Sequence, residues 1–151
     1  MTEHELLDIA IKEAKLGFSE GGVPIGAAIM DAQGNLISSA HNLIYQTSDP
    51  TAHAEMNAAR KLGVRDDWHT LTLATTLSPC LMCTGLITFY RIPRIVIGDD
   101  ITVPGARQTL SRHNVSFKII NDPACIDMLH TWIDQHPEKW SPIEGNENPD
   151  N

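Results

Sequence analysis

Two short motifs constrain this chain more than any other feature of its sequence. The first is the His-x-Glu motif at residues 53–55, and the second is the Pro-Cys-x-x-Cys motif at residues 79–83. Together they supply one imidazole, two thiols and one carboxylate, and the first three are groups that bind zinc. Because Cys80 and Cys83 are three residues apart, a helix would place both sulfurs on one face. A metal ion held by both motifs would join the starts of two helices, which limits the folds open to the chain.

The length and charge of the chain exclude several classes of protein. With 151 residues it has the size of one ordinary domain, so we expect a single domain over residues 1–151. It lacks the roughly 18 consecutive apolar residues of a membrane span, and its acidic start is unlike a signal or transit peptide. We therefore expect a cytoplasmic protein without a membrane partner. The net charge of −8 repels phosphate backbones, which predicts a small neutral substrate and no nucleic acid.

The order of the expected elements predicts an α/β fold. A five-stranded mixed sheet would begin with an antiparallel hairpin and carry helices on both faces. Residues 42–50 are polar and aperiodic, which predicts a loop, and Thr51 is the expected N-cap of the next helix. The tail is polar apart from Trp140, and its last half-dozen residues have the composition of a disordered end. The expected helices are 2–18, 52–62, 80–90, 107–112 and 123–136, and the expected strands are 25–30, 36–40, 70–76, 94–98 and 116–120.

The two motifs fit the chemistry of a catalytic zinc site. Such sites hold the metal with three protein ligands and leave one position for water. His53, Cys80 and Cys83 would supply the three ligands from the first turns of two helices, where the helix N-terminus favours the thiolate. Glu55 is too close to His53 in the chain to reach the same metal. It is free to take a proton from metal-bound water, whose pKa falls to about 7, and so to leave hydroxide for attack.

Each motif taken alone has a more ordinary explanation. A single Cys-x-x-Cys can be a redox dithiol, and a single histidine is more often a core or surface residue than a ligand. Both motifs, however, open expected helices at one edge of the sheet, where α/β proteins bind ligands. A non-catalytic zinc module is less favoured, because a structural site usually has four protein ligands. The third cysteine, Cys125, is expected at a buried helix position.

The two motifs belong to a longer set of residues. The set adds Glu-Gly-Gly-Val-Pro-Ile-Gly at 20–26, His-Asn at 41–42, Thr-Thr-Leu-Ser-Pro at 75–79, Thr-Gly at 84–85, Ile-Pro-Arg at 92–94, and Trp140. With this set, the sequence resembles the cytidine and deoxycytidylate deaminase superfamily over nearly its whole length. Within it, the sequence is most similar to the fungal-type cytosine deaminases. The paired H-x-E and P-C-x-x-C motifs are the general signature of zinc deaminases.

The resemblance implies a three-layer α/β/α fold of the cytidine-deaminase type and one Zn²⁺ per subunit. It implies conversion of cytosine to uracil and ammonia, as in pyrimidine salvage, with Glu55 as the proton shuttle. A C-terminal segment, about residues 137–151, would fold over the active site. A homodimer would form through the helix face that carries Ile87, Phe89 and Tyr90, with the following Ile92-Pro93.

The resemblance also implies a set of substrate contacts. Asn42 would hydrogen-bond the ring carbonyl, and the backbone carbonyl of Ser78 would accept from the leaving amino group. Ile25 would pack against the ring, and Trp140 would close the pocket. The full implied set is Ile25, Asn42, Ala54, Ser78, Trp140 and Glu144.

Two stretches depart from the family pattern. The family has an aspartate that accepts a ring N–H shortly after the tail tryptophan, and here Ile143 stands at that place with Glu144 one residue later. The family's aromatic residue in the loop after the fourth strand is replaced by Thr-Val-Pro at 102–104. A guanine or nucleoside deaminase, or a deaminase of a related amino-heterocycle, therefore remains an alternative. A tRNA adenosine deaminase is less favoured, because the C-terminal tail is acidic.

Overall fold

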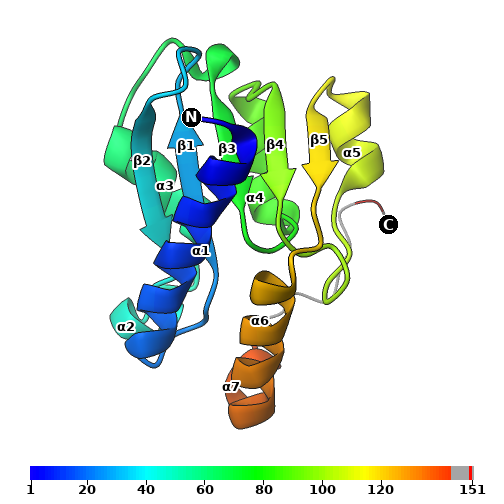
Figure 1. Ribbon diagram of the computed structural model, residues 1–151. Helices are drawn as coiled ribbons and strands as arrows, with labels where there is room; N and C mark the ends of the chain where they lie inside the picture. The colour runs from blue at the N-terminus through cyan, green and yellow to red at the C-terminus, as the bar shows by residue number, and fades with distance from the viewer. Residues whose placement is uncertain (144–149, 151) are drawn as a thin grey trace.

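A single mixed sheet of five strands forms the centre of the molecule (Figure 1). The computed structural model describes residues 1–143 and 150, so the expectations for Glu144 and for the extreme C-terminus lie outside the described residues. The strand order is β2-β1-β3-β4-β5. β1 pairs antiparallel with both β2 and β3, whereas β3, β4 and β5 are parallel to one another. The strands are β1 (Gly26–Met30), β2 (Leu36–His41), β3 (Thr72–Thr75), β4 (Arg94–Ile97) and β5 (Ser116–Ile119).

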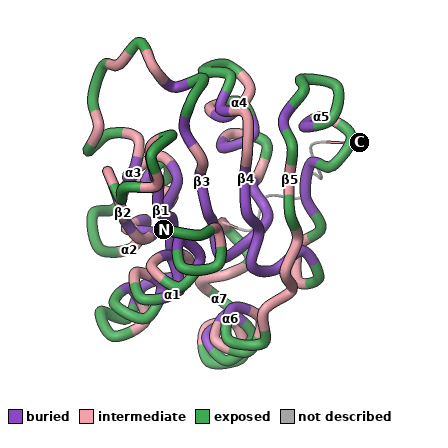
Figure 2. The backbone as a smooth tube through the Cα atoms, turned by 45° about the horizontal axis from the view of Figure 1, so that its top comes forward, coloured by how far each residue is buried: buried purple, intermediate pink, exposed green. Residues whose placement is uncertain are grey.

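Helices cover both faces of the sheet, as the sequence predicted. α1 (Glu3–Ser19) and α6 (Pro123–Gln135) lie on one face, and α3 (Ala54–Leu62), α4 (Leu81–Phe89) and α5 (Arg107–Arg112) lie on the other. Alternate residues of the strands serve the two layers, since Ala28 packs with the α1 side and Ile29 packs with the α3 side. Figure 2 shows the result, with β1, β3 and β4 mostly buried and the outer faces of α1 and α6 exposed. The three-layer α/β/α expectation is confirmed.

The first and last long helices begin where their capping residues predict. The Thr2 hydroxyl accepts from the Glu5 N–H at 3.2 Å, and the Glu5 carboxylate accepts from the Thr2 N–H at 2.7 Å, which completes a capping box for α1. The Asp122 carboxylate accepts from the Ala124 N–H at the start of α6. Each cap stabilises its helix by about 1 kcal/mol. Cys125 is buried on α6, as expected.

Close backbone packing joins α1 to the sheet. A Cβ added to Gly26 would lie 1.9 Å from the backbone oxygen of Ala10, so only glycine allows this approach. None of the helices in the described part of the chain has the length and hydropathy that crossing a membrane requires.

Two local expectations were wrong, and two short elements were not predicted. Residues 42–50 contain a short helix, α2 (Ile44–Thr47), instead of a plain loop, and the tail contains α7 (Pro137–Trp140). A 3-10 turn, η1 (Trp68–Thr70), precedes β3. Thr51 does not cap α3, because the Asp49 carboxylate accepts from its N–H at 2.8 Å and from its hydroxyl at 2.7 Å. The helix begins two residues later than predicted, with His53 as its N-cap.

One edge of the sheet collects segments from four strands. Gly26, at the start of β1, is opposite His41 at the end of β2, and Ala27 is opposite Thr75 at the end of β3. Thr75 is in turn level with Ile97, at the end of β4. β1 runs in the opposite direction to β2, β3 and β4. Its first residue and the last residues of those three strands therefore meet at this edge. The segments that follow build the site.

Candidate functional site

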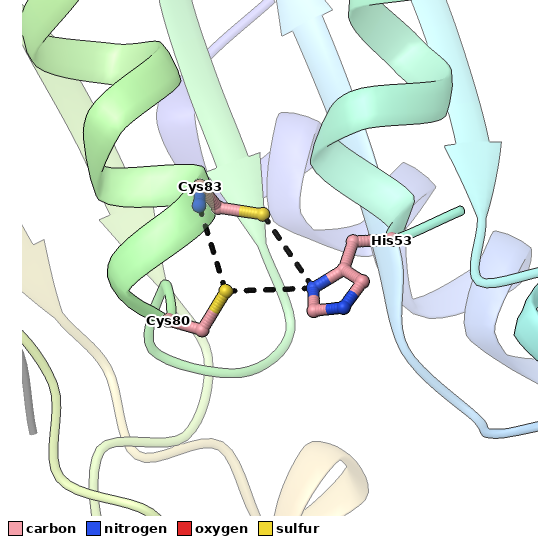
Figure 3. A group of neighbouring side chains, drawn as sticks. All are labelled: His53, Cys80 and Cys83. Atoms are coloured by element: carbon pink, nitrogen blue, oxygen red, sulfur yellow. Dashed lines mark hydrogen bonds between the residues drawn. The ribbon is translucent and has the colours of Figure 1, made fainter. Parts of the chain in front are cut away.

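The side chains of His53, Cys80 and Cys83 converge at this edge of the sheet (Figure 3). The Nδ1 atom of His53 is 3.5 Å from the Sγ atom of Cys80 and 3.7 Å from the Sγ atom of Cys83. Each residue offers one ligand atom, and these atoms all lie within 4.8 Å of one another. The structure therefore brings the two sequence motifs together as one group that could hold a metal ion.

The spacing of these atoms fits zinc in particular. Zn–S bonds of about 2.3 Å and Zn–N bonds of about 2.0–2.1 Å, held at the tetrahedral angle, separate nitrogen from sulfur by about 3.6 Å. The two measured nitrogen–sulfur distances are 3.5 and 3.7 Å. One imidazole and two thiols, with a fourth position open, are also the ligand set of a catalytic rather than a structural zinc site.

Two ligand side chains occupy helix N-caps. His53 precedes α3 and Cys80 precedes α4, both with extended backbone dihedral angles, whereas the sequence placed them inside the first turns. The Cys83 N–H, in the first turn of α4, points to the Cys80 sulfur at 3.5 Å. This N–H is one of those that a helix start leaves without a backbone partner, so it stabilises negative charge on the sulfur.

The pKa values of the two thiols are shifted in opposite directions. The hydrogen bond from Cys83, reinforced by one from His53, lowers the pKa of Cys80 to about 4 despite its burial. The same hydrogen bond with Cys80, together with burial, raises the pKa of Cys83 above its ordinary value. At neutral pH one sulfur is therefore already a thiolate, the form that binds metal.

Glu55 lies beside this group but is held by other contacts. Its side chain is buried, with the residue only 4% exposed. Oε1 accepts from the Thr75 hydroxyl at 2.8 Å, and Oε2 lies 3.4 Å from the Cys83 sulfur. Burial, and then the negative charge of Cys80, raise the pKa of the carboxyl above its usual range. A raised pKa suits a group that must both take and release a proton near neutral pH.

A cavity of about 550 Å³ opens onto Glu55 and two of the ligand side chains. Its volume is within the range of small-molecule sites. Apolar side chains form most of its wall. The lining residues are Ile25, Asn42, Ile44, Pro50, His53, Glu55, Leu77, Ser78, Pro79, Cys80, Leu81, Met82, Val103, Pro104, Trp140, Pro142 and Ile143.

The structure places four of the expected substrate contacts in this wall: Ile25, Asn42, Ser78 and Trp140. Ala54 is fully buried and does not line the cavity, because its place just inside α3 turns it toward the core formed with Ala58. Glu144 lies outside the described residues.

Asn42 has a defined orientation. Its Oδ1 accepts from the Ile44 N–H at 3.0 Å, and its backbone N–H donates to the Ile25 carbonyl at 2.9 Å. The side-chain oxygen is thereby occupied, which leaves the Nδ2 amide as the donor that Asn42 can offer to the cavity.

The C-terminal helix brings Trp140 to the cavity through contacts that the sequence did not reveal. The Trp140 ring packs edge-on against Trp132, with centroids 6.5 Å apart. The Tyr45 hydroxyl, from α2, donates to the backbone carbonyl of Lys139. The Lys139 ammonium lies 5.3 Å from the centre of the Tyr45 ring. Tyr45 therefore fastens α7 to the segment that follows Asn42.

Sequence reasoning also missed Asp99 and Asp100, two buried acids that follow β4. The signal was present, since two acidic residues directly after an apolar strand mark the edge where α/β proteins bind ligands. Thr75, the partner of Glu55, gave no comparable signal, because a threonine in a strand is ordinary.

The expected dimer face divides into two parts. Ile87 and Ile92 are fully buried in the core of this chain, so the prediction that they form an intermolecular surface was wrong. Ile87 is buried because α4 packs this side against the core, and Ile92 follows the helix into the same core. Phe89 is 79% exposed and Tyr90 is 42% exposed.

Comparison with known proteins locates the site within a family. The family model "Cytidine and deoxycytidylate deaminase zinc-binding region" matches residues 1–99, which contain all three ligand side chains and Glu55. The chain is 34% identical over 137 residues to the cytosine deaminase of Candida albicans, with 89% of this chain and 91% of that protein covered.

Relatives with other substrates match as well. The chain is 39% identical over 99 residues to the tRNA-specific adenosine deaminase of Aquifex aeolicus, with 64% of this chain and 65% of that protein covered. Among solved structures, the guanine deaminase of Bacillus subtilis superposes with a TM-score of 0.57 at 33% identity. That superposition covers 64% of this chain and 64% of that one.

Proposed function

We propose that this chain, which belongs to the cytidine and deoxycytidylate deaminase family, hydrolytically deaminates a free nucleobase, with cytosine as the substrate and uracil and ammonia as the products. The observation that carries the proposal is the composition of the cavity. Among the described residues, its wall combines His53, Cys80 and Glu55 with mostly apolar side chains, and it includes no lysine or arginine. A phosphate would find no cation there, which disfavours nucleotides.

The residues of the site divide the chemical work. His53, Cys80 and Cys83 would hold the zinc ion, which would supply a Lewis acid able to lower the pKa of water toward about 7. Glu55 takes a proton from the attacking water and delivers it to the ring nitrogen. It then takes the remaining proton from the hydroxyl group now attached to the ring carbon and gives it to the amino group. The carbon–nitrogen bond breaks, ammonia leaves, and that hydroxyl oxygen becomes the new ring carbonyl. Burial raises the pKa of the Glu55 carboxyl above its ordinary value, which makes the carboxylate a stronger base toward the water and so supports its role in proton transfer.

Other residues hold the ring. The Asn42 Nδ2 amide donates to the ring carbonyl, because its Oδ1 is already engaged by the Ile44 N–H. The Ser78 carbonyl accepts from the amino group that leaves. Ile25 and Trp140 pack against the ring from opposite ends of the chain. Glu144 would accept the ring N–H in place of Ile143, and Glu144→Gln tests this role through the KM for the base.

Guanine is the second candidate substrate. Ile143, which lines the cavity where an acid was expected, favours a base that does not place an N–H at that position. The cavity volume of about 550 Å³ also leaves room for a two-ring base. A tRNA substrate is less favoured, because the chain carries a net charge of −8.

The decisive experiment measures ammonia release from cytosine, isocytosine, guanine, cytidine and triazine-type bases by the zinc-loaded protein. We expect turnover of a free base, with cytosine fastest. Glu55→Gln should retain zinc and the Thr75 hydrogen bond while losing about 10²- to 10⁴-fold in kcat. Turnover confined to cytidine, or wild-type turnover by Glu55→Gln, would refute the proposal.

We also propose that the protein is a cytoplasmic homodimer, and a role in pyrimidine salvage follows if cytosine is its base. The exposed rings of Phe89 and Tyr90, at the end of α4, support an interface there. Phe89→Glu should shift the sedimentation coefficient to that of a monomer. A wild-type monomer at micromolar concentration would contradict the dimer. The three free cysteines are suited to a reducing compartment.

A further inference from the structure

Asp100 is a buried carboxylate that the proposed mechanism does not use. It follows β4 at the edge of the sheet where the cavity lies, and its side chain is completely shielded from solvent. A buried charge is costly unless it is paired and fully hydrogen-bonded. Asp100 does not itself line the cavity. Its contacts therefore explain what it does.

Both carboxylate oxygens of Asp100 are fully engaged. Oδ1 accepts from the Ser78 hydroxyl and from the Gly105 N–H at 3.0 Å. Oδ2 accepts from the Arg107 guanidinium through Nε at 2.8 Å and also through Nη2. The Asp100 N–H donates to the side-chain oxygen of Asn121 at 2.9 Å. One residue thus joins the segment before α4, the loop after β4 and the start of α5.

Ser78 is held in place by hydrogen bonds to both Asp99 and Asp100. Its N–H donates to the Asp99 carbonyl at 2.8 Å, and its hydroxyl donates to the Asp100 carboxylate. Within the described part of the chain, the Ser78 carbonyl accepts no hydrogen bond. Holding the N–H and the hydroxyl in this way leaves that carbonyl as the polar group that Ser78 can offer to the cavity.

The loop after β4 is packed tightly on Ser78. A Cβ added to Gly105 would lie 2.5 Å from the Ser78 Cβ, so the glycine backbone itself forms the contact. Val103 and Pro104, just before this glycine, line the cavity. The position of this wall relative to Ser78 is therefore set by the hydrogen bonds that Asp100 accepts from both sides.

We infer that Asp100, charge-balanced by Arg107, is a positioning residue that determines which ring the site accepts. It acts through Ser78, which meets the amino end of the ring, and through the Val103-Pro104 wall, which limits the size of the ring. Asp100 touches no substrate. The inference rests on the proposed function, because it assigns the recognition of the amino group to the Ser78 carbonyl.

The test compares Arg107→Gln and Asp100→Asn with Arg65→Gln. Arg107 is half exposed, so its replacement leaves the fold intact while removing the partner of Asp100. Asparagine at position 100 keeps an acceptor for Ser78 and Gly105 but turns an amide N–H toward Arg107. The control is Arg65→Gln, which breaks the ion pair between Arg65 and Asp67, an arginine–aspartate pair of the same chemistry. Arg65 does not line the cavity.

Two readouts are needed. The first is kcat/KM for the fastest base and for its ring-methylated analogue, with zinc content measured in parallel. Both variants should lose about tenfold or more on the parent base and shift the ratio toward the larger ring at least fivefold, whereas Arg65→Gln should match the wild type. A purely structural role would lower both activities equally and leave the ratio unchanged, which would overturn the inference.

The second readout is hydrogen exchange at the Gly105 N–H, the donor to Asp100. Exchange should accelerate at least tenfold in Arg107→Gln and stay at the wild-type rate in Arg65→Gln. This measurement does not depend on turnover. If the wild-type protein deaminates none of the bases, the proposed function fails, while the exchange rate still shows whether Asp100 positions the loop. Wild-type exchange in both Asp100→Asn and Arg107→Gln would overturn the positioning role.

Discussion

The hydrogen bond from Tyr45 to Lys139 makes a specific prediction about the C-terminal helix. The Tyr45 hydroxyl donates to the Lys139 carbonyl, while the ring packs 6.4 Å from Trp132 and lies under the Lys139 ammonium. Tyr45→Phe removes the hydroxyl and keeps the ring. It therefore tests the contribution of one hydrogen bond to holding α7, and with it Trp140, against the cavity.

The magnitude follows from the energy of that bond. A typical intramolecular hydrogen bond contributes about 1 kcal/mol net, and its loss here leaves one backbone carbonyl that water can reach when α7 moves away. A change of about 1 kcal/mol raises the population of the undocked tail about fivefold. The aromatic contacts of Tyr45 should be unchanged, so the global stability of the protein should fall by no more than this amount.

Limited proteolysis measures the undocked population. Lys139 is the only lysine or arginine after Lys118, so trypsin cleavage there releases one diagnostic fragment, residues 140–151. When opening and closing are faster than cleavage, the cleavage rate follows the open population, and it should rise about fivefold in Tyr45→Phe. Tyr90→Phe, which alters the only other tyrosine, is the matched control. Equal cleavage rates in the two variants would refute the argument that Tyr45 fastens the tail.

Three further predictions concern the metal, the packing of glycines and acid stability. Cys83→Ala should lose zinc and melt at a lower temperature, whereas Cys125→Ala should keep full zinc occupancy by elemental analysis; full occupancy in Cys83→Ala would disprove the ligand assignment. Gly26→Ala should lower the free energy of unfolding, measured in urea, by about 3 kcal/mol, because the added Cβ clashes with α1. Gly85→Ala, at an open position in α4, should raise the free energy of unfolding by about 0.5–1 kcal/mol. Burial acts to raise the pKa of Asp100, but the hydrogen bonds from Ser78 and Arg107 outweigh it and hold the pKa below its usual value. The stability that this carboxylate contributes is therefore present at neutral pH and is lost as the pH falls through its folded pKa. Acid unfolding, followed by circular dichroism, should begin at a higher pH in Arg107→Gln than in the wild type. An unchanged onset would contradict this assignment.

Short-range chemistry explains why much of the fold could be predicted. The capping box of Thr2 and Glu5, the Asp122-Pro123 start of α6 and the buried runs of the strands are each specified by neighbouring residues. The same holds for the metal group, because the spacing of Cys80 and Cys83 brings their sulfurs close together wherever a helix begins at that point.

Other features depend on competing hydrogen bonds or on contacts between distant segments. Thr51 has the right chemistry to cap α3, but Asp49 engages it first, and the helix begins at Ala54. The short helix α2 begins after the Asn42 side chain accepts from the Ile44 N–H, and no periodicity over four residues could reveal it. The wall of the cavity combines side chains far apart in sequence, so its membership could not be read from local patterns.

The placement of the cavity residues along the chain has a consequence for how such a protein can change. Glu55, the three ligand side chains, Asn42 and Ser78 all lie within residues 1–99, the stretch that the family model matches. The remaining walls, formed by Val103, Pro104, Trp140, Pro142 and Ile143, come from the last third of the chain. The ligand group and Glu55 thus lie in one stretch of the chain, and part of the cavity wall lies in a second stretch that follows it. Replacing the second stretch with that of a relative would therefore change these walls while the ligand group, Glu55, Asn42 and Ser78 stay in place.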